Sequence, residues 1–216
     1  MITNIKGLRE TYAAPNARAL AKQLRHLDVH CQRFIGLSPF VVIASDGGTL
    51  QLDASPRGGE PGFVKVHDDR TLLIPDAQGN NLLYTLTNIL ASGKVGLLFL
   101  VPGVDETLRI NGMARLRDED AYLEVFSAEK RPPKLVIEVA VAEAFLHCGK
   151  SMMRSKLWST EARIERSAMP SMGQMLKDQT PDRQRRRKHS KRWWRSTSGT
   201  CKGRSPSVSP TLESQR

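Results

Sequence analysis

The sequence is poor in cysteine and contains no long hydrophobic run. Its three cysteines, Cys31, Cys148 and Cys201, lie far apart and form no C-x-x-C pair, which argues against a zinc ribbon or a disulfide framework. No apolar stretch approaches the ~20 residues of a membrane-spanning helix, and the first residues lack the apolar segment of a signal peptide. We therefore expect a soluble, reduced, cytoplasmic protein with no metal site and no membrane partner.

Acidic residues are scarce in one part of the chain only. Residues 181–216 carry 11 Lys and Arg against 2 Asp and Glu, whereas residues 1–180 carry 22 against 20. The net charge of +11 and the pI near 10 therefore describe the tail and not the rest of the chain. A basic pI of this origin does not make the whole protein a nucleic-acid binder.

The tail itself is too polar and too basic to bury a core, so we expect residues 181–216 to be disordered. One interpretation is a nucleic-acid-binding arm, in which basic residues contact phosphates and Trp193 and Trp194 stack on bases. The other is the product of a shifted reading frame, because the composition changes abruptly at residues 178–180. The abrupt change favours the second interpretation slightly.

Both ends of the first 180 residues have helical character. Residues 1–37 form a predicted helical segment with helices near 13–24 and 27–37, and 161–180 form a helical extension containing Met169, Met172, Met175 and Leu176. His26, His30 and Cys31 could suggest a metal cluster. A helix with two surface histidines and one packed cysteine is favoured, since no further ligand stands at metal-binding spacing.

Residues 38–160 alternate short apolar runs with turns rich in Gly, Pro, Asp and Asn. This pattern, without repeated βαβ spacing, predicts an α+β fold that is mainly β: an antiparallel Greek-key split barrel with short flanking helices. Asp46-Gly47 predicts a hairpin turn. The expected strands are 40–45, 49–53, 63–66, 71–74, 94–101, 106–116 and 134–141.

Three polar segments stand out as candidate anion sites. The stretch 55–59 predicts a loop in which glycines allow close approach and Arg57 offers donors to a phosphate; the alternative is an ordinary loop with a solvated arginine. Asn80 or Asn81 is expected to cap a helix whose N-terminus favours anions, with leucines 82, 83, 86 and 90 and Ile89 facing the core; the alternative is a plain capped helix. Lys150 and Arg154 are spaced to face one anion together.

His147 and Cys148 are adjacent in the sequence. Neighbouring residues of a strand point to opposite faces, which argues against a catalytic Cys–His pair.

Residues 38–158 resemble the pyridoxamine 5'-phosphate oxidase-like flavoproteins, which share an FMN-binding split barrel, and resemble most an uncharacterised FMN-dependent branch. The match covers more than half of the chain. It rests on Ser55-Pro56-Arg57-Gly58, Ile74-Pro75-Asp76, Gly79-Asn80-Asn81, Gly96-Leu97-Leu98-Phe99, Glu106-Thr107-Leu108-Arg109-Ile110-Asn111-Gly112, His147-Cys148-Gly149-Lys150 and Arg154-Ser155-Lys156-Leu157-Trp158.

The resemblance implies a homodimer with FMN at the subunit interface. By this resemblance, the residues near the flavin or its phosphate are Ser55, Arg57 and Gly58, and those along the ring are Phe63, Val64 and Lys65. The positions where the oxidases carry flavin- and phosphate-binding residues are occupied by Pro75, Asp76, Asn80 and Asn81. The resemblance also implies Thr107 and Arg109 at the ring edge, and Lys150 and Arg154 from the partner subunit.

The sequence departs from the oxidases in two respects. It lacks their Arg-Lys phosphate clamp, so the phosphate charge falls to Arg57, Lys150, Arg154 or the helix N-terminus. It also lacks their C-terminal substrate-binding arginine motif, so vitamin B6 synthesis is not expected.

The resulting hypothesis is an FMN-dependent oxidoreductase with an unknown small-molecule substrate, in which no general base is identified and Arg109 tunes the flavin or orients substrate. Alternatives are a non-enzymatic flavin carrier, the same barrel with heme or a deazaflavin, and nucleic-acid binding through the tail.

Overall fold

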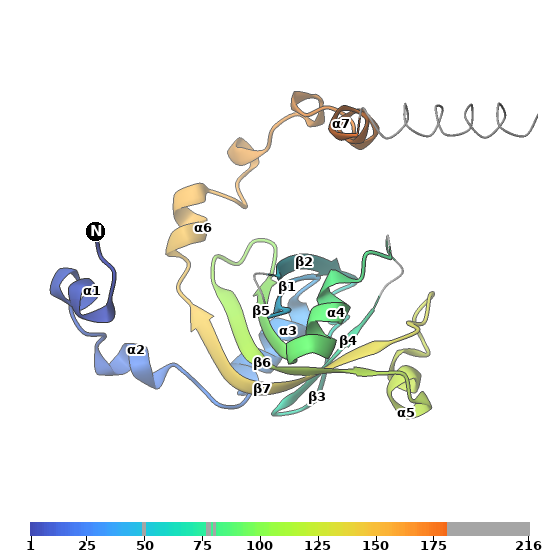
Figure 1. Ribbon diagram of the computed structural model, residues 1–216, viewed down its shortest axis with the longest axis horizontal. Helices are drawn as coiled ribbons and strands as arrows, with labels where there is room; N and C mark the ends of the chain where they lie inside the picture. Colours follow the sequence, from blue (N-terminus) through green and yellow to red (C-terminus); the bar gives the residue numbers. More distant parts are fainter. Residues whose placement is uncertain (49–50, 77–78, 80, 181–216) are drawn as a thin grey trace, which may run out of the picture. The chain divides into compact units, whose positions relative to one another are not determined.

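The computed structural model describes residues 1–48, 51–76, 79 and 81–180 (Figure 1). The chain divides into two units, Met1–Arg163 and Ile164–Arg216. The predictions about residues 181–216 lie outside the described residues. The predicted domain boundaries at residues 37, 160 and 180 stay predictions.

The first unit contains one seven-stranded antiparallel sheet in the order β2-β1-β5-β6-β7-β4-β3, which is the predicted split barrel. Each predicted strand corresponds to one of these, although the second begins three residues late and the last runs on to His147. The strands are β1 (Phe40–Asp46), β2 (Leu52–Gly58), β3 (Lys65–Asp68), β4 (Thr71–Pro75), β5 (Lys94–Leu100), β6 (Thr107–Arg117) and β7 (Val136–His147).

The coiling of the sheet encloses one main hydrophobic core. Alternate residues of each strand point inward, as period-two patterning requires, so Val41 and Ile43 of β1 share a buried cluster with Leu72 and Ile74 of β4. A smaller cluster, of Leu73, Phe126 and Val136, lies on the other face of β4 and β7.

Short helices flank the barrel. Helix α3 (Val29–Leu37) begins where the Asp28 carboxylate accepts the Cys31 backbone N–H at 2.8 Å, and it buries Cys31 and Ile35. The predicted helix over 13–24 is much shorter. The remaining elements of this unit are α1 (Ile5–Thr11), α2 (Ala17–Ala21), α4 (Tyr84–Ser92), α5 (Asp120–Leu123), η1 (Glu124–Phe126), α6 (Lys150–Ser155) and η2 (Thr160–Ala162).

The predicted loop over 55–59 is wrong, because residues 55–58 belong to strand β2. Pro56, which suggested a loop, is tolerated because β2 is at the edge of the sheet, where a missing N–H leaves no ladder bond broken. Ser55, Arg57 and Gly58 therefore lie on a strand, and Ser55 and Arg57 point to the same face.

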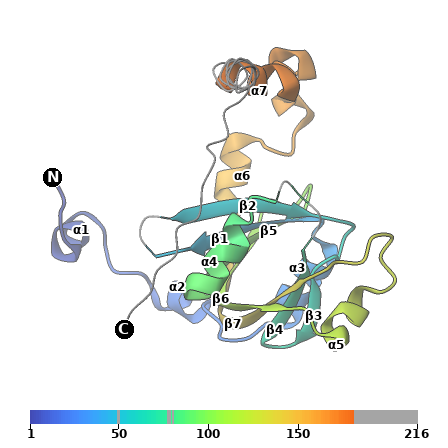
Figure 2. The same ribbon diagram turned by 45° about the vertical axis from the view of Figure 1, so that its right-hand side comes forward.

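Helix α4 also differs from its prediction. It starts at Tyr84 after Leu83, whose backbone is left-handed (φ 57°), and no side chain caps it, so Asn81 is not the N-cap; Asn80 lies outside the described residues. The buried positions are Thr85, Asn88 and Ile89, while Leu82, Leu83 and Leu90 are exposed. Figure 2 shows α4 lying across β1 and β2, against which it packs.

Hydrogen bonds explain why polar residues of α4 face inward. The Asn88 amide donates to the Gln51 carbonyl at 2.8 Å and to the Ser45 hydroxyl at 3.1 Å, and so ties α4 to the turn end of the β1–β2 hairpin. These buried polar groups need partners, a requirement that outweighs the apolar pattern of the leucines.

In the second unit, the described residues 164–180 contain η3 (Arg166–Ala168) and α7 (Met172–Gln179). The Ser171 hydroxyl caps α7 by accepting the Gln174 N–H. The predicted amphipathic helix therefore exists but begins at Met172, and Met169 precedes it.

Candidate functional site

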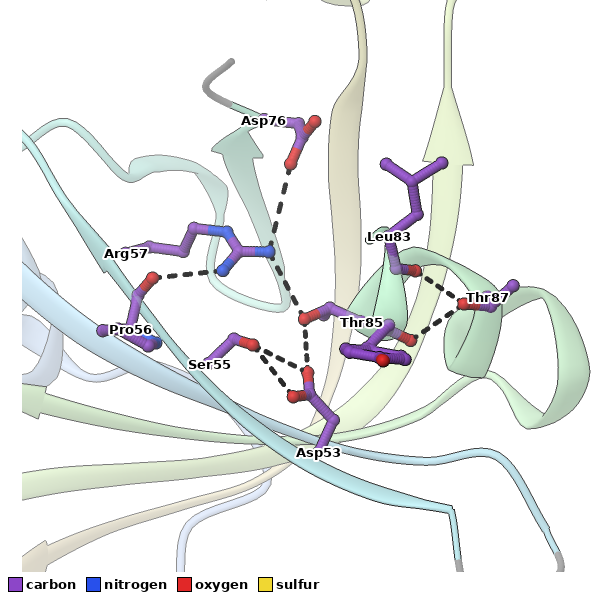
Figure 3. A network of polar contacts seen from close by, with 9 residues as sticks. Asp53, Ser55, Pro56, Arg57, Asp76, Leu83, Thr85 and Thr87 are labelled. Atoms are coloured by element: carbon purple, nitrogen blue, oxygen red, sulfur yellow. Dashed lines mark hydrogen bonds and ion pairs between the residues drawn. The ribbon is translucent and has the colours of Figure 1, made fainter. Parts of the chain in front are cut away.

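Strand β2 presents three polar side chains on one face (Figure 3). Asp53, Ser55 and Arg57 alternate along the strand and are partly buried, whereas the residues between them are exposed. They face the first turn of α4 and the end of β4, so one site draws on three elements.

Thr85, in the first turn of α4, joins this network at its centre. Its hydroxyl donates to Asp53 Oδ2 at 2.6 Å and accepts from Arg57 Nη2 at 3.3 Å. The Ser55 hydroxyl lies 2.9 Å from both oxygens of the same carboxylate. Asp53 thus receives hydroxyl donors from two elements, and within the described residues its link to Arg57 runs through Thr85.

Asp76 approaches Arg57 from the other side. It follows β4, where its N–H donates to the Leu135 carbonyl at 2.9 Å, and its Oδ1 lies 4.0 Å from Arg57 Nη2. Burial raises the pKa of the Asp76 carboxyl above its ordinary value, and the positive charge of Arg57 opposes this rise. The structure thus brings together Ser55, Arg57 and Asp76 of the predicted site.

Phe63 and Val64 lie elsewhere in the protein. They precede β3 and their side chains are buried in the main core, so the strand edge expected over 63–65 begins only at Lys65. The Lys65 ammonium donates to the Gly62 carbonyl at 2.9 Å and lies 4.0 Å from Glu129. Only the backbone of this segment, or Lys65, is therefore available to a ligand outside the core.

Two further predicted residues end strands, and a third lies just before α4. Gly58 ends β2 and is exposed, and Pro75 ends β4 and is partly buried. Asn81 is exposed and has a left-handed backbone (φ 58°) in the segment that leads into α4.

A second polar cluster lies on the outer face of β6 and β7. Arg109 Nη2 lies 2.5 Å from Glu143 Oε1, and the guanidinium stacks on the Phe145 ring at 5.3 Å. Within the described residues, Arg109 Nε is buried without an acceptor. Arg109 points away from the side on which Leu108 and Ile110 are buried.

His147 and Thr107 complete this region. Thr107 is buried at the start of β6, opposite His147 at the end of β7. The His147 ring packs edge-on against Phe145, with centroids 4.8 Å apart. Burial first, and then the positive charges of Arg109 and Lys22, lower the pKa of His147.

Lys150 and Arg154 lie on α6, directly after β7, and both are exposed. The segment packs closely against residues 104–105, which connect β5 to β6. A Cβ on Gly149 would lie 2.7 Å from the Asp105 side chain, and the Trp158 indole N–H donates to the Val104 carbonyl at 2.9 Å. Neither basic residue is part of the Arg57 network within the described chain.

The candidate metal cluster does not form. Cys31 is 1% exposed, and burial and Asp28 raise the pKa of its thiol to about 12, whereas His26 and His30 are exposed. Among the described residues no three His, Cys, Asp or Glu side chains are arranged to hold a metal ion. No helix in the same residues combines the length and apolar character needed to cross a membrane.

Sequence reasoning missed Asp53, Thr85 and Glu143. Asp53 could have been found from its spacing, since 53, 55 and 57 share a face if 52–58 is a strand. Thr85 and Glu143 had no local signal, because their partners are 32 and 34 residues away.

Three solved structures illustrate the similarity of the barrel to known proteins; no curated protein matches the chain. HupZ of Group A Streptococcus is 19% identical (TM-score 0.47), with 55% of this chain and 92% of that chain covered. An FMN-binding protein from Syntrophomonas wolfei subsp. wolfei is 12% identical (TM-score 0.42; 54% and 83% covered), and the FAD binding protein from Mycobacterium smegmatis is 16% identical (TM-score 0.40; 57% and 97% covered).

A family model described as pyridoxamine 5'-phosphate oxidase matches residues 27–148, which are more than half of the chain and include every strand of the barrel. The chain therefore belongs to the pyridoxamine 5'-phosphate oxidase family.

Proposed function

We propose that this protein binds a flavin, specifically FMN, and acts as an FMN-dependent oxidoreductase on a small molecule. The proposal rests on the position of Arg57, a partly buried arginine in a barrel of this family, held beside the start of α4, which no side chain among the described residues caps. A guanidinium next to unpaired helix N–H groups is a suitable place for a phosphate.

The charges around Arg57 fit a phosphate on one condition. The Asp76 carboxylate must move aside, because it lies where a phosphate would contact Arg57 Nη2. At 4.0 Å this contact is longer than the about 2.7–2.9 Å of a strong charge-assisted hydrogen bond, so a phosphate oxygen can replace it. Asp53 is already satisfied by hydroxyl donors and need not move.

In this proposal the remaining predicted residues surround the flavin, some at its ring and some at its phosphate. Phe63, Val64 and Lys65 contribute the backbone leading into edge strand β3, with Pro75, Asn80 and Asn81 near the phosphate end and Thr107 at the ring edge. Arg109 has an Nε donor without an acceptor among the described residues, which suits a group contributed by ligand or partner. The bound flavin would supply the hydride or electron chemistry.

We also propose a homodimer in which Lys150 and Arg154 reach the site of the partner subunit. The outer face of β2, β1, β5 and β6 supports it, since Leu52, Leu98 and Met113 are exposed there at 77%, 36% and 51%. A shallow hollow of about 460 Å³ crosses this face, lined in part by Ala44, Ala54 and Gly96. Apolar surface of this kind commonly marks an interface.

The test is to purify the full chain and to record its visible spectrum before and after adding FMN, together with its mass in solution. A bound-flavin spectrum that is perturbed relative to free FMN, in a dimer, supports the proposal. Failure to take up FMN refutes it. Arg109→Ala is expected to bind FMN but to change its rate of reduction; unchanged binding and reduction would remove Arg109 from the site.

A further inference from the structure

Asp53 contacts the ligand-facing arginine only through another residue. Its carboxylate accepts from the hydroxyls of Ser55 and Thr85, and Thr85 in turn accepts from Arg57. All three contacts are drawn in Figure 3, where Thr85 lies between Asp53 and Arg57. The arrangement is a chain of three groups that ends at the guanidinium.

The direction of the hydrogen bonds in this chain is determined by chemistry. An ionised carboxylate only accepts, so the single hydroxyl proton of Thr85 points at Asp53. The Thr85 oxygen then has only lone pairs left to offer, and these face Arg57, which can only donate. Thr85 is 2% exposed, so water has little access to replace either contact.

A second threonine in the same helix shows the ordinary alternative. The Thr87 hydroxyl donates back to the Leu83 carbonyl at 2.6 Å, one helical turn earlier, which is a common habit of threonine in helices. Thr85 instead donates across to strand β2. Thr85 is the second residue of α4, so no carbonyl of the helix lies one turn before it, and its proton goes to the Asp53 carboxylate.

We propose that Asp53 is a positioning residue: through Thr85 it orients Arg57 so that the site prefers flavins that carry a phosphate over flavins that do not. This inference rests on the proposed flavin binding. It assigns to Asp53 an effect opposite to that of its charge, because a negative group near Arg57 would by itself weaken binding of an anion.

The positioning effect of Asp53 and the effect of its charge change the preference for FMN in opposite directions, so one measurement separates them. Affinities of the full-length protein for FMN and for riboflavin, which lacks the phosphate, are measured by flavin fluorescence quenching in wild type, Asp53→Ala, Thr85→Val and Thr85→Ser. We expect wild type to prefer FMN. We expect Asp53→Ala and Thr85→Val to reduce that preference by about tenfold, the effect of one hydrogen bond to a charged group. Thr85→Ser keeps the hydroxyl and should retain most of the preference.

Asp46→Ala is the matched control. Asp46 is also an aspartate of the β1–β2 hairpin, and its carboxylate accepts the Gly48 N–H at 2.8 Å and not a group of the Arg57 network. Its loss should leave the ratio of the two affinities unchanged. Because the readout is a ratio, a variant that is merely less stable changes both affinities and not their preference.

Each other outcome has a distinct meaning. A preference that stays the same or rises in Asp53→Ala overturns the positioning role and leaves flavin binding intact. A wild-type protein that binds both flavins equally also overturns it. A wild type that binds neither refutes the proposed function itself.

Discussion

Arg57 lies on β2 and Asp76 directly follows β4, two strands near opposite ends of the sheet, yet Arg57 Nη2 and Asp76 Oδ1 lie 4.0 Å apart. The coiling of the barrel makes this pair, and burial places it where a carboxylate is costly. The relationship predicts a pH dependence of ligand binding.

Asp76→Asn is expected to strengthen FMN binding at pH 7 by about threefold, the scale of a partly exposed ion pair that no longer competes for Arg57. The folded pKa of Asp76 is raised above its ordinary 3.8, so the neutral acid, which does not hold Arg57, persists to higher pH. The ratio of wild-type to variant affinity should therefore approach one at low pH and fall as pH rises through the folded pKa. Titration of the FMN phosphate is common to both proteins and cancels.

The same shift predicts a stability change. A raised folded pKa contributes stability that is complete below the unfolded pKa and is lost as pH rises through the folded pKa. Denaturant unfolding should show that Asp76→Asn gains stability relative to wild type as pH increases from below 4 to 7. A constant difference across that range would contradict the assignment.

The inward face of α4 gives a second prediction. Asn88→Leu should destabilise the protein by about 1–3 kcal/mol, since it removes the amide that donates to the buried Ser45 hydroxyl and leaves the Gln51 carbonyl with the Gly47 N–H alone of its two donors. Leu90→Ala, on the exposed face of the same helix, is expected to change stability by less than about 0.5 kcal/mol. Urea unfolding of the two variants measures both, and a larger loss for Leu90→Ala would restore the leucine-facing helix that the sequence suggested.

The contrast between Asn88 and Leu90 shows where sequence reasoning succeeds and fails. Strands were predicted well because a short apolar run bounded by turn residues, such as 95–101 before Pro102-Gly103, is a local signal. The orientation of α4 depends on carbonyls of a hairpin more than 35 residues away, which no local pattern records.

In the candidate site, too, single residues could be predicted from the sequence but their contacts with distant residues could not. Arg57 was identified from its residue type in a glycine-rich stretch, and Asp76 from the family resemblance. Their proximity could not be predicted, because it depends on the order in which β2 and β4 enter the sheet. Thr85 was hidden further by Pro56, which made a strand look like a loop and so concealed the shared face of Asp53, Ser55 and Arg57.

Strand β6 carries a close approach that only glycine allows. The pairing of β6 with β7 shifts register between Asn111 and Gly112, and a Cβ on Gly112 would lie 2.2 Å from the Ala140 carbonyl oxygen. Gly112→Ala should lower the free energy of unfolding by about 2–3 kcal/mol, since the backbone must shift.

Gly36→Ala is the control for this substitution. Gly36 is inside α3, and a Cβ there meets nothing within 4 Å. Alanine should stabilise the protein by up to about 1 kcal/mol through its better helix propensity. Thermal unfolding of the two variants should therefore move in opposite directions, and equal melting temperatures would contradict the register shift.

The cluster around Phe145 gives a last prediction, which needs no ligand. His147 packs against Phe145, and Arg109 and Lys22 lie over the same ring at 5.3 and 5.4 Å. Their positive charges disfavour a protonated imidazole, so they lower the pKa of His147 together with burial, the largest cause.

Arg109→Gln should therefore raise the pKa of His147 toward its ordinary 6.5, as followed by the NMR shifts of its ring protons. Arg163→Gln removes an exposed arginine that has no part in the shift and should leave that pKa unchanged. Because burial remains in the Arg109 variant, the rise should be incomplete, and a fall would show that the loss of Arg109 mainly closes water out of the cluster.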